Sequence, residues 1–509
     1  MRPFDLSVPS QLMAALGPEL LLMGGAALLL LWAGWGRSSM QRQRAVGLTA
    51  MALTFAVGVY VVWSLYQVRS ATGGPIAVDN FRWLADVVIL LGTLFALALT
   101  IDDNARQQLA TAESHVLILF SSSGMMLLAA AQDLMIVFLG IEIMSIAVYC
   151  LAGINRRSAR GAEASLKYFL LGAFATGFLL YGMALVYGAT GTTNLADIAV
   201  RVSELNLGHS PLLLIGIAIL FIGFGFKTAS VPFHMWTPDV YDGSPPSITA
   251  YMAATVKAAA FAALLRVWME AFPGEFRVWQ PIIAGIAIAT MIVGNVVGLA
   301  QKNVVRMLAY SSIAHAGYLL IALAAASSQS GSTVLFYLLV YTLTTFGAFG
   351  IIIVLARGTD RPVMMEDFTG LWAVRPWLAL GMGFLMFSFL GLPMFGGAGF
   401  FAKWYILQAA LQAPVPQTTL AVVLVLTTVV SAGYYLYVVM VMFMKPRPEG
   451  AAVPAPAPML TRAVVVISVV AVLLLGIVPE QVVRLARAGA MKPVATVQAA
   501  PATVGAVDQ

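Results

Sequence analysis

Segments of about 20 apolar residues recur along nearly the whole chain, and this repetition constrains the fold more than any other feature. An α-helix rises about 1.5 Å per residue, so about 20 apolar residues cross a hydrocarbon core of about 30 Å. The sequence therefore predicts an all-α integral membrane protein with fourteen transmembrane helices. The expected spans are 12–33, 45–66, 83–101, 115–131, 134–152, 162–188, 211–230, 247–268, 279–300, 303–325, 333–356, 377–411, 418–443 and 460–478.

The composition agrees with this class and excludes several kinds of site. Of the 509 residues, 61% are hydrophobic and 10% are charged, whereas soluble domains carry about 25% charged residues. The single cysteine, Cys150, excludes a disulfide within the chain and a thiolate-bound metal cluster. The four histidines lack zinc-site spacing, and no nucleotide-binding glycine motif is present. We therefore expect no redox cofactor and no metal in this chain.

The distribution of positive charge predicts the orientation. With fourteen helices both termini lie on one side, and alternate loops hold fifteen and eight Lys and Arg residues. Because cytoplasmic loops carry the excess of Lys and Arg, both termini are expected on the non-cytoplasmic side. The net charge of +6 is mostly this loop bias, so it does not indicate a nucleic-acid partner.

Five cations fall inside the expected spans, where a charge costs about 2.5 to 3.5 kcal/mol at the bilayer centre. Arg266 is near a helix end, and we expect its side chain to reach the membrane surface. The other four are lysines, and a lysine within the membrane usually pairs with an acid, lines a water-filled cavity or carries protons. These are Lys167, Lys227, Lys257 and Lys403.

Two glutamates are candidate partners of these lysines. Glu142 is eight residues after Leu134, about 12 Å deep, and is the one carboxylate expected that far inside an apolar run. Glu163 precedes Lys167 by four residues, the favourable order for an ion pair on one helix face. Burial disfavours the charged form of an amine and a nearby carboxylate favours it, so a movable Glu142 would switch a lysine between proton-binding states. Simple neutralisation that holds helices together is the alternative.

Two helices are predicted to be broken. Pro232 follows Lys227 by five residues, and Pro393 with the glycines at 396, 397 and 399 precedes Lys403. Paired interruptions are typical of inverted repeats in transporters, and helices 4–8 and 9–13 would be two five-helix units with the broken helices 7 and 12 in fourth place. Plain packing kinks are the alternative. The expected divisions are 1–114, 115–272, 273–445 and 446–509, the last comprising a Pro/Ala linker, one helix and a mobile tail after Met491.

Histidines could connect the lysines. His315 shares a helix face with Ser311 and Tyr318 and is expected at mid-depth. A lone membrane histidine is also commonly a hydrogen-bonded structural residue, so both roles stay open. His234 follows the break after Lys227 and is either a proton relay or a cap on exposed carbonyls.

The chain resembles the antiporter-like membrane subunits of respiratory complex I over nearly its whole length. The most specific match is the stretch PFHMWTPDVYDGSP after Lys227, together with Glu142, Lys257, and Lys403 near the second break. The resemblance implies that Glu142 pairs with Lys227, with Lys167 as a second candidate partner. It also implies that Lys257 is the central carrier and that Lys403 passes the proton outward, with His234 and His315 as relay candidates.

The resemblance further implies that the chain is one proton-translocating module of a membrane-bound translocase. FMN, iron-sulfur clusters and quinone would then lie in partner subunits, and the partners would be neighbouring antiporter-like and small membrane subunits in the bacterial inner membrane. Two other functions are weighed beside this one. The first is a subunit of a multi-subunit cation/proton antiporter or membrane-bound hydrogenase, and the second is a scaffold whose buried charges only fix helix register.

Overall fold

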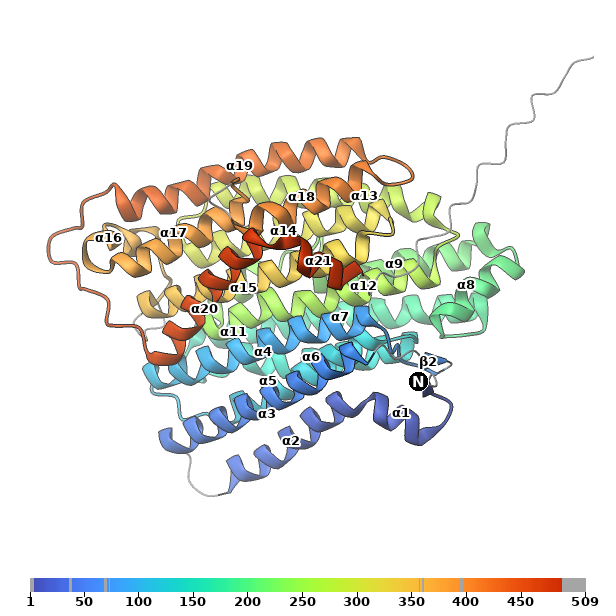
Figure 1. The fold of residues 1–509 in the computed structure, drawn as a ribbon, viewed down its shortest axis with the longest axis horizontal. Helices are drawn as coiled ribbons and strands as arrows, with labels where there is room; N and C mark the ends of the chain where they lie inside the picture. Colours follow the sequence, from blue (N-terminus) through green and yellow to red (C-terminus); the bar gives the residue numbers. More distant parts are fainter. Residues whose placement is uncertain are drawn as a thin grey trace, which may run out of the picture.

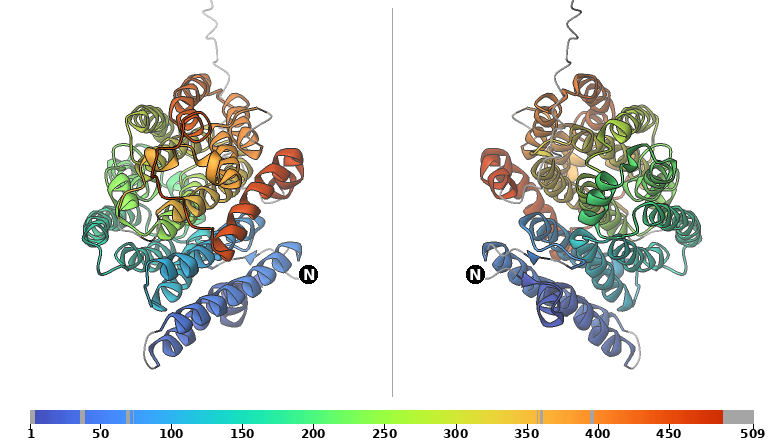
Figure 2. Two further views of the ribbon diagram at one scale, coloured as in Figure 1. Left: turned by 90° about the vertical axis from the view of Figure 1, so that its left-hand side faces the viewer. Right: turned by 90° about the vertical axis from the view of Figure 1, so that its right-hand side faces the viewer.

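The protein is a bundle of long helices that run alongside one another, as the computed structural model shows from the side in Figure 1 and along the helices in Figure 2. The structure describes residues 4–35, 39–67, 71–72, 74–356, 358, 361–393 and 397–487. Gly396, the tail after Met491 and several loop cations in the charge count lie outside these residues. The only strands among them are the two-residue segments β1 (Phe4–Asp5) and β2 (Ala71–Thr72), which pair in parallel.

The helices follow the chain in four groups. The first contains α1 (Pro9–Ala15), α2 (Gly17–Gly34), α3 (Met40–Tyr66) and α4 (Asn80–Arg106). The second contains α5 (Glu113–Ala130), α6 (Leu134–Ala152), α7 (Ala159–Thr190), α8 (Leu195–Glu204), η1 (Leu207–His209), α9 (Pro211–Thr228), α10 (Thr237–Gly243), α11 (Pro246–Tyr251), the π-helical turn η2 (Met252–Val256) and α12 (Lys257–Ala271). The third contains α13 (Phe276–Leu299), α14 (Val304–Ala325), α15 (Ser330–Ala356), η3 (Met365–Phe368), α16 (Leu371–Val374), α17 (Pro376–Leu390), α18 (Ala398–Leu411) and α19 (Thr418–Phe443). The last contains α20 (Met459–Ile477) and α21 (Pro479–Arg487).

The described residues contain thirteen helical segments long and apolar enough to cross a membrane. They correspond to thirteen of the fourteen expected spans. The remaining expected span, 377–411, is divided into α17 and α18, which are 15 and 14 residues long. The multi-pass α-helical class is therefore confirmed, while the crossing formed by these two pieces stays a prediction.

The interruptions fall where the prolines predicted them. α9 ends at Thr228 because Ala229 adopts a left-handed conformation with φ of 59°, and the chain stays non-helical past Pro232. α17 ends at Leu390 because Gly391 adopts φ of 72°, and α18 begins at Ala398 beyond Pro393. Each interruption therefore frees backbone carbonyl groups close to a lysine.

The most deeply buried helices lie at the centre of the bundle. The apolar window of Pro246–Ala271 is 100% buried, whereas that of α20 is only 28% buried. In Figure 1, α2 and α3 form one edge, α19 forms the opposite edge, and α20 runs obliquely across the bundle. Residues 446–458 join α19 to α20 without a helix, as the proline content predicted. Side chains on α12, α14 and α15 are therefore surrounded by protein rather than by lipid.

Candidate functional site

Lys257 begins α12 directly after the π-helical turn and lies in the core. The residue is 2% exposed, and its Nζ donates to the Ser312 carbonyl at 2.6 Å and to the Ser312 hydroxyl. The same nitrogen lies 5.7 Å from the centroid of the Tyr341 ring. No carboxylate forms an ion pair with it among the described residues. Neutral acceptors therefore hold an amine that can be either charged or neutral.

Lys227 lies in the last turn of α9, just before the first interruption. The residue is 4% exposed, and its Nζ donates to Ser145 Oγ at 2.7 Å and to Tyr149 Oη at 3.1 Å. Both acceptors are on α6, the helix that carries Glu142. Lys227 thus stands at the C-terminal end of α9, the end at which helices commonly carry basic residues.

Lys403 lies on α18, just beyond the second interruption. The residue is 6% exposed, and its Nζ donates to the Leu390 carbonyl at 2.9 Å and reaches Thr428 Oγ1 at 3.5 Å. The Leu390 carbonyl is one of the groups that the end of α17 leaves without a helical partner. The break therefore supplies the acceptor for this lysine directly.

His315 lies between Lys257 and Lys403 and is hydrogen-bonded to hydroxyl groups. Its Nδ1 lies 2.5 Å from Tyr337 Oη, and its Nε2 lies 3.2 Å from Tyr435 Oη, which also contacts the Ser311 hydroxyl. A cavity of about 230 Å³ is lined by both His315 and Lys403. Ser311 and Ser312 are adjacent on α14, so polar groups continue from Lys257 past His315 to Lys403.

Glu142 is on α6, one turn before Ser145, and is partly buried. Among the described residues it forms no ion pair, so the pairing with Lys227 or Lys167 that the family resemblance implied is not present in this structure.

Lys167 lies on the outside of the isolated chain rather than in its core. Its side chain is 42% exposed, and its Nζ binds Glu163 at 2.7 Å and Asp239 at 2.9 Å. The predicted pair with Glu163 is thus confirmed as a contact. Asp239 also binds Arg306 at 2.7 Å. Partial burial raises the pKa of the Asp239 carboxyl, but the hydrogen bonds from Lys167 and Arg306 outweigh burial and lower it.

His234 lies in the non-helical stretch between α9 and α10 and is partly buried. Its Nδ1 has no hydrogen-bond partner among the described residues. Burial lowers the pKa of this imidazole, and a backbone hydrogen bond at Pro232 offsets the effect only in part. The neutral ring is therefore favoured, which fits either a proton acceptor or a backbone cap.

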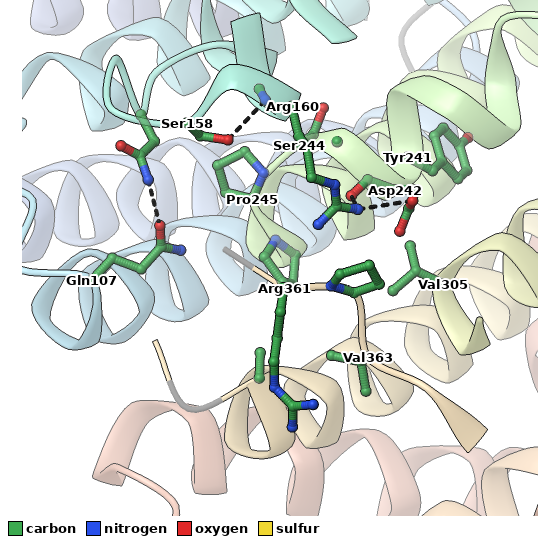
Figure 3. A pocket seen from close by; sticks show the side chains of 16 residues that line it. Gln107, Ser158, Arg160, Tyr241, Asp242, Ser244, Pro245, Val305, Arg361 and Val363 are labelled. Carbon is green, nitrogen blue, oxygen red and sulfur yellow. Dashed lines mark hydrogen bonds and ion pairs between the residues drawn. The ribbon is translucent and has the colours of Figure 1, made fainter. Parts of the chain in front are cut away.

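A pocket of about 540 Å³, lined by both polar and apolar groups, opens between the two halves of the bundle, where α7, α10 and the 361–363 segment meet (Figure 3). Arg160 Nη2 binds Asp242 Oδ2 at 2.8 Å inside it, and Tyr241 and Ser244 also line it. The pocket is on the side of the helices that carries the Arg-rich loops.

The structure corrects the sequence interpretation at two buried charges. Arg266 does not reach the membrane surface: its side chain is fully buried and binds Asp79 at 2.8 Å and Glu270 at 3.0 Å. A buried charge that the sequence interpretation omitted is Asp86 on α4, which is fully buried beside Arg82, whereas Glu142 is only partly buried. The i, i+4 spacing of Arg82 and Asp86 could have revealed this pair.

Several polar partners of the lysines were missed for a common reason. Ser145, Ser312, Thr428 and Tyr435 are isolated polar residues in apolar helices, and they acquire a role only when another helix brings an amine or imidazole beside them. Ser311 was identified because it shares a helix with His315. Contacts between helices leave no comparable periodic signal in a single sequence.

Comparison with known proteins agrees with this geometry. Residues 131–431 match the family described as NADH:quinone oxidoreductase/Mrp antiporter, TM. NADH-quinone oxidoreductase subunit N of Gemmatimonas aurantiaca is 51% identical over 95% of this chain and 94% of that protein. The subunit N of Trichlorobacter lovleyi is 46% identical over 72% of this chain and 74% of that protein.

Solved structures show the same fold. A chain of respiratory complex I from Thermus thermophilus with bound aureothin superposes with a TM-score of 0.78 and 35% identity, covering 93% of this chain and all of that one. A chain of the Mrp complex from Dietzia has a TM-score of 0.80 at 22% identity, covering 94% and 98%, which shows the fold alone. The chain thus belongs to the NADH:quinone oxidoreductase/Mrp antiporter family of membrane proteins.

Proposed function

We propose that the chain is the proton-translocating membrane subunit of a proton-pumping NADH:quinone oxidoreductase, in the position that subunit N holds in its relatives. The observation that carries this proposal is the row of three buried lysines, Lys227, Lys257 and Lys403, each held by uncharged acceptors. A buried amine with neutral partners can gain or lose a proton without breaking a fixed ion pair. FMN, the iron-sulfur clusters and quinone belong to partner subunits.

Proton transfer begins at Glu142 and Lys227. When Glu142 approaches Lys227, attraction between the two keeps the amine protonated; when Glu142 withdraws, Lys227 gives its proton toward Lys257. Ser312 then links Lys257 to α14, and His315 with its tyrosine partners leads to the cavity at Lys403. Lys403 passes the proton to the non-cytoplasmic side. The surface group Glu163, Lys167 and Asp239 would collect protons on the opposite side, and His234 would relay them inward.

The finer architecture of the proposal follows the same logic. Helices 4–8 and 9–13 form two inverted repeats that span residues 115–272 and 273–445, preceded by 1–114 and followed by 446–509. α17 and α18 together form the crossing expected at 377–411, which is the twelfth in chain order and brings the total to fourteen. Both termini lie on the non-cytoplasmic side of a bacterial inner membrane, and the exposed apolar faces contact lipid and neighbouring antiporter-like and small membrane subunits.

The test is proton pumping by the purified complex in sealed vesicles. Lys257→Ala and Glu142→Ala are expected to leave assembly intact and to lower the number of protons pumped per electron. Lys302→Ala, which removes a lysine from an exposed loop position, is the matched control and should pump normally. Unchanged stoichiometry in both core variants would refute the assignment.

The alternative assemblies are less well supported, because the curated relatives at 51% and 46% identity are complex I subunits. The Mrp-type chain and the archaeal sulfane sulfur reductase chain resemble this one at 22% and 24% identity. Affinity purification separates the possibilities, since a complex I subunit should copurify with flavin and iron-sulfur proteins. Copurification with cation/proton antiporter subunits would favour the other assembly.

A further inference from the structure

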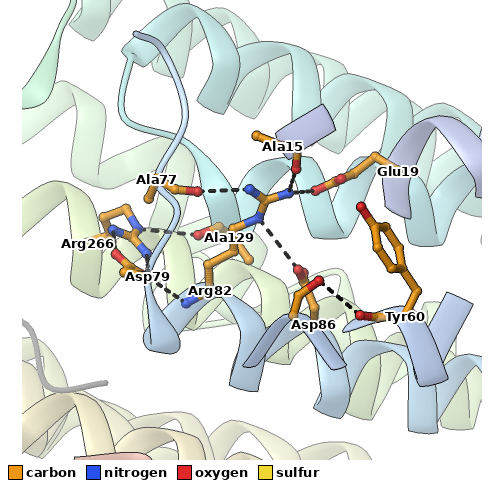
Figure 4. Close-up of polar contacts among 10 residues, drawn as sticks. Ala15, Glu19, Tyr60, Ala77, Asp79, Arg82, Asp86, Ala129 and Arg266 are labelled. Atoms are coloured by element: carbon orange, nitrogen blue, oxygen red, sulfur yellow. Dashed lines mark hydrogen bonds and ion pairs between the residues drawn. The ribbon is translucent and has the colours of Figure 1, made fainter. Parts of the chain in front are cut away.

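A second buried charge network lies apart from the lysine row, where α2, α4 and α12 meet (Figure 4). We call it the α4 cluster. It consists of two guanidinium groups and four carboxylates: Arg82, Arg266, Glu19, Asp79, Asp86 and Glu270. Arg266 is nine residues after Lys257 on α12, or about 14 Å along that helix. The proposed proton path above makes no use of this cluster.

The two arginines are already engaged by other groups. Arg266 binds Asp79 and Glu270, while Arg82 Nη2 binds Glu19 Oε1 at 2.6 Å and the Ala15 carbonyl at 2.8 Å. Arg82 Nη1 binds the Ala77 carbonyl at 2.9 Å. Only Nε of Arg82 is without a hydrogen-bond partner among the described residues. The cluster thus holds two more carboxylates than guanidiniums.

Asp86 is the carboxylate of the α4 cluster to which neither arginine donates a hydrogen bond. It is 0% exposed, neither of its oxygens has a hydrogen-bond partner among the described residues, and Arg82 Nε is 3.6 Å away. The charged groups that face it are Glu19 on α2, Arg82 on its own helix, Asp79 before α4 and Arg266 on α12. A buried carboxylate without a donor is costly and becomes neutral by binding a proton.

We propose that Asp86 is an additional proton-binding site, which exchanges its proton with the membrane surface through the α4 cluster. Asp79 and Glu270, at the outer end of the cluster, have side chains that are 39% and 24% exposed. On release, the O–H bond of Asp86 breaks, water takes the proton, and the electron pair stays on the carboxylate. Arg82 Nε is placed to donate a hydrogen bond to that carboxylate after a small movement, so the cluster accommodates both states.

This inference adds a proton site to the proposed translocation function, but its first test does not depend on pumping. Infrared difference spectra of the whole complex report the C=O stretch of a protonated carboxylic acid. Asp86→Asn should remove one such band. Glu19→Gln should not remove it, because the Glu19 carboxylate is the one that contacts Arg82 Nη2 at 2.6 Å. A band that survives Asp86→Asn, or one that is lost in Glu19→Gln instead, would overturn the proposal.

The second test asks whether the proton exchanges during turnover. Asp86→Asn should assemble and lower proton pumping several-fold, Asp86→Glu should restore most of it, and Asp197→Asn, at an exposed site on α8, should pump normally. If the infrared band belongs to Asp86 but pumping by Asp86→Asn is normal, the exchange is refuted and a fixed structural proton remains. Neither result would alter the expectations for Glu142 and Lys257.

Discussion

Lys227 and Lys403 occupy comparable places in the two halves of the bundle, yet their surroundings differ. Each lysine is beside an interrupted helix, but Lys227 is held by side chains of α6, whereas Lys403 is held by a backbone carbonyl. Neither lysine forms an ion pair with a carboxylate among the described residues, but Glu142 is one helical turn from Ser145, an acceptor of Lys227.

This difference suggests different roles in proton transfer for the two halves of the bundle. A carboxylate on a neighbouring helix can move relative to Lys227 and change the charge that this amine prefers. The Leu390 carbonyl is a fixed dipole that changes only if the break itself rearranges. In the proposed function, we therefore assign to the first half the response to a charge signal from a neighbouring subunit, and to the second half the receipt of the proton.

The largest expected effect comes from removing the movable charge. Glu142→Gln keeps the shape of the side chain but cannot attract Lys227 electrostatically, and we expect pumping to fall about tenfold, equivalent to about 1.4 kcal/mol in the barrier. The measurement is the initial rate of vesicle acidification. Glu113→Gln, which neutralises an exposed glutamate, is the control. Equal rates in the two variants would refute the proposal that Lys227 responds to a carboxylate in a way that Lys403 does not.

A pair of variants tests the acceptors themselves. Ser145→Ala removes the 2.7 Å hydrogen bond from the buried Lys227 amine but leaves the bond to Tyr149 at 3.1 Å, so part of the stabilisation is kept. Thr428→Val removes a contact at 3.5 Å that is already at the limit of a hydrogen bond. We expect Ser145→Ala to slow pumping at least several-fold and Thr428→Val to change it little. The reverse order would mean that Lys403, and not Lys227, depends on its side-chain acceptor.

The link through the histidine should show a smaller effect. Tyr435→Phe removes the hydroxyl that contacts both Ser311 and His315, a loss of about 1 kcal/mol per hydrogen bond. Pumping is expected to fall a few-fold while electron transfer without a proton gradient is nearly normal. Tyr437→Phe, at an exposed tyrosine of the same helix, provides the control. If protons bypass His315, the two variants should pump at the same rate.

The smallest effect is expected at the surface. Lys167 is 42% exposed, so its ion pairs with Glu163 and Asp239 are screened by solvent and contribute about 0 to 1 kcal/mol. Lys167→Met should lower pumping slightly at low salt and not measurably at high salt. A loss as large as that of Glu142→Gln would show that Lys167 becomes buried when the subunits assemble.

The sequence was sufficient for features that depend on one helix at a time. Apolar length predicted the helices, the prolines predicted both breaks, and the spacing of Glu163 and Lys167 predicted their contact. It was insufficient where two helices meet: Arg266 was placed at the membrane surface because its partner Asp79 is far away in the chain, and Asp86 was overlooked within an apolar run. Tertiary partners decide whether a charge can be buried, and a single sequence does not specify them.

The π-helical turn Met252–Val256 immediately before Lys257 sets the direction in which that side chain points. Each residue of an α-helix advances the chain by about 100° around its axis. Residues of a π-helical turn advance by less than this, so a regular α-helix through the same five residues would carry Lys257 farther around the axis and aim it away from Ser312. In this protein the length of one wide turn is as decisive for the central amine as the presence of the lysine itself.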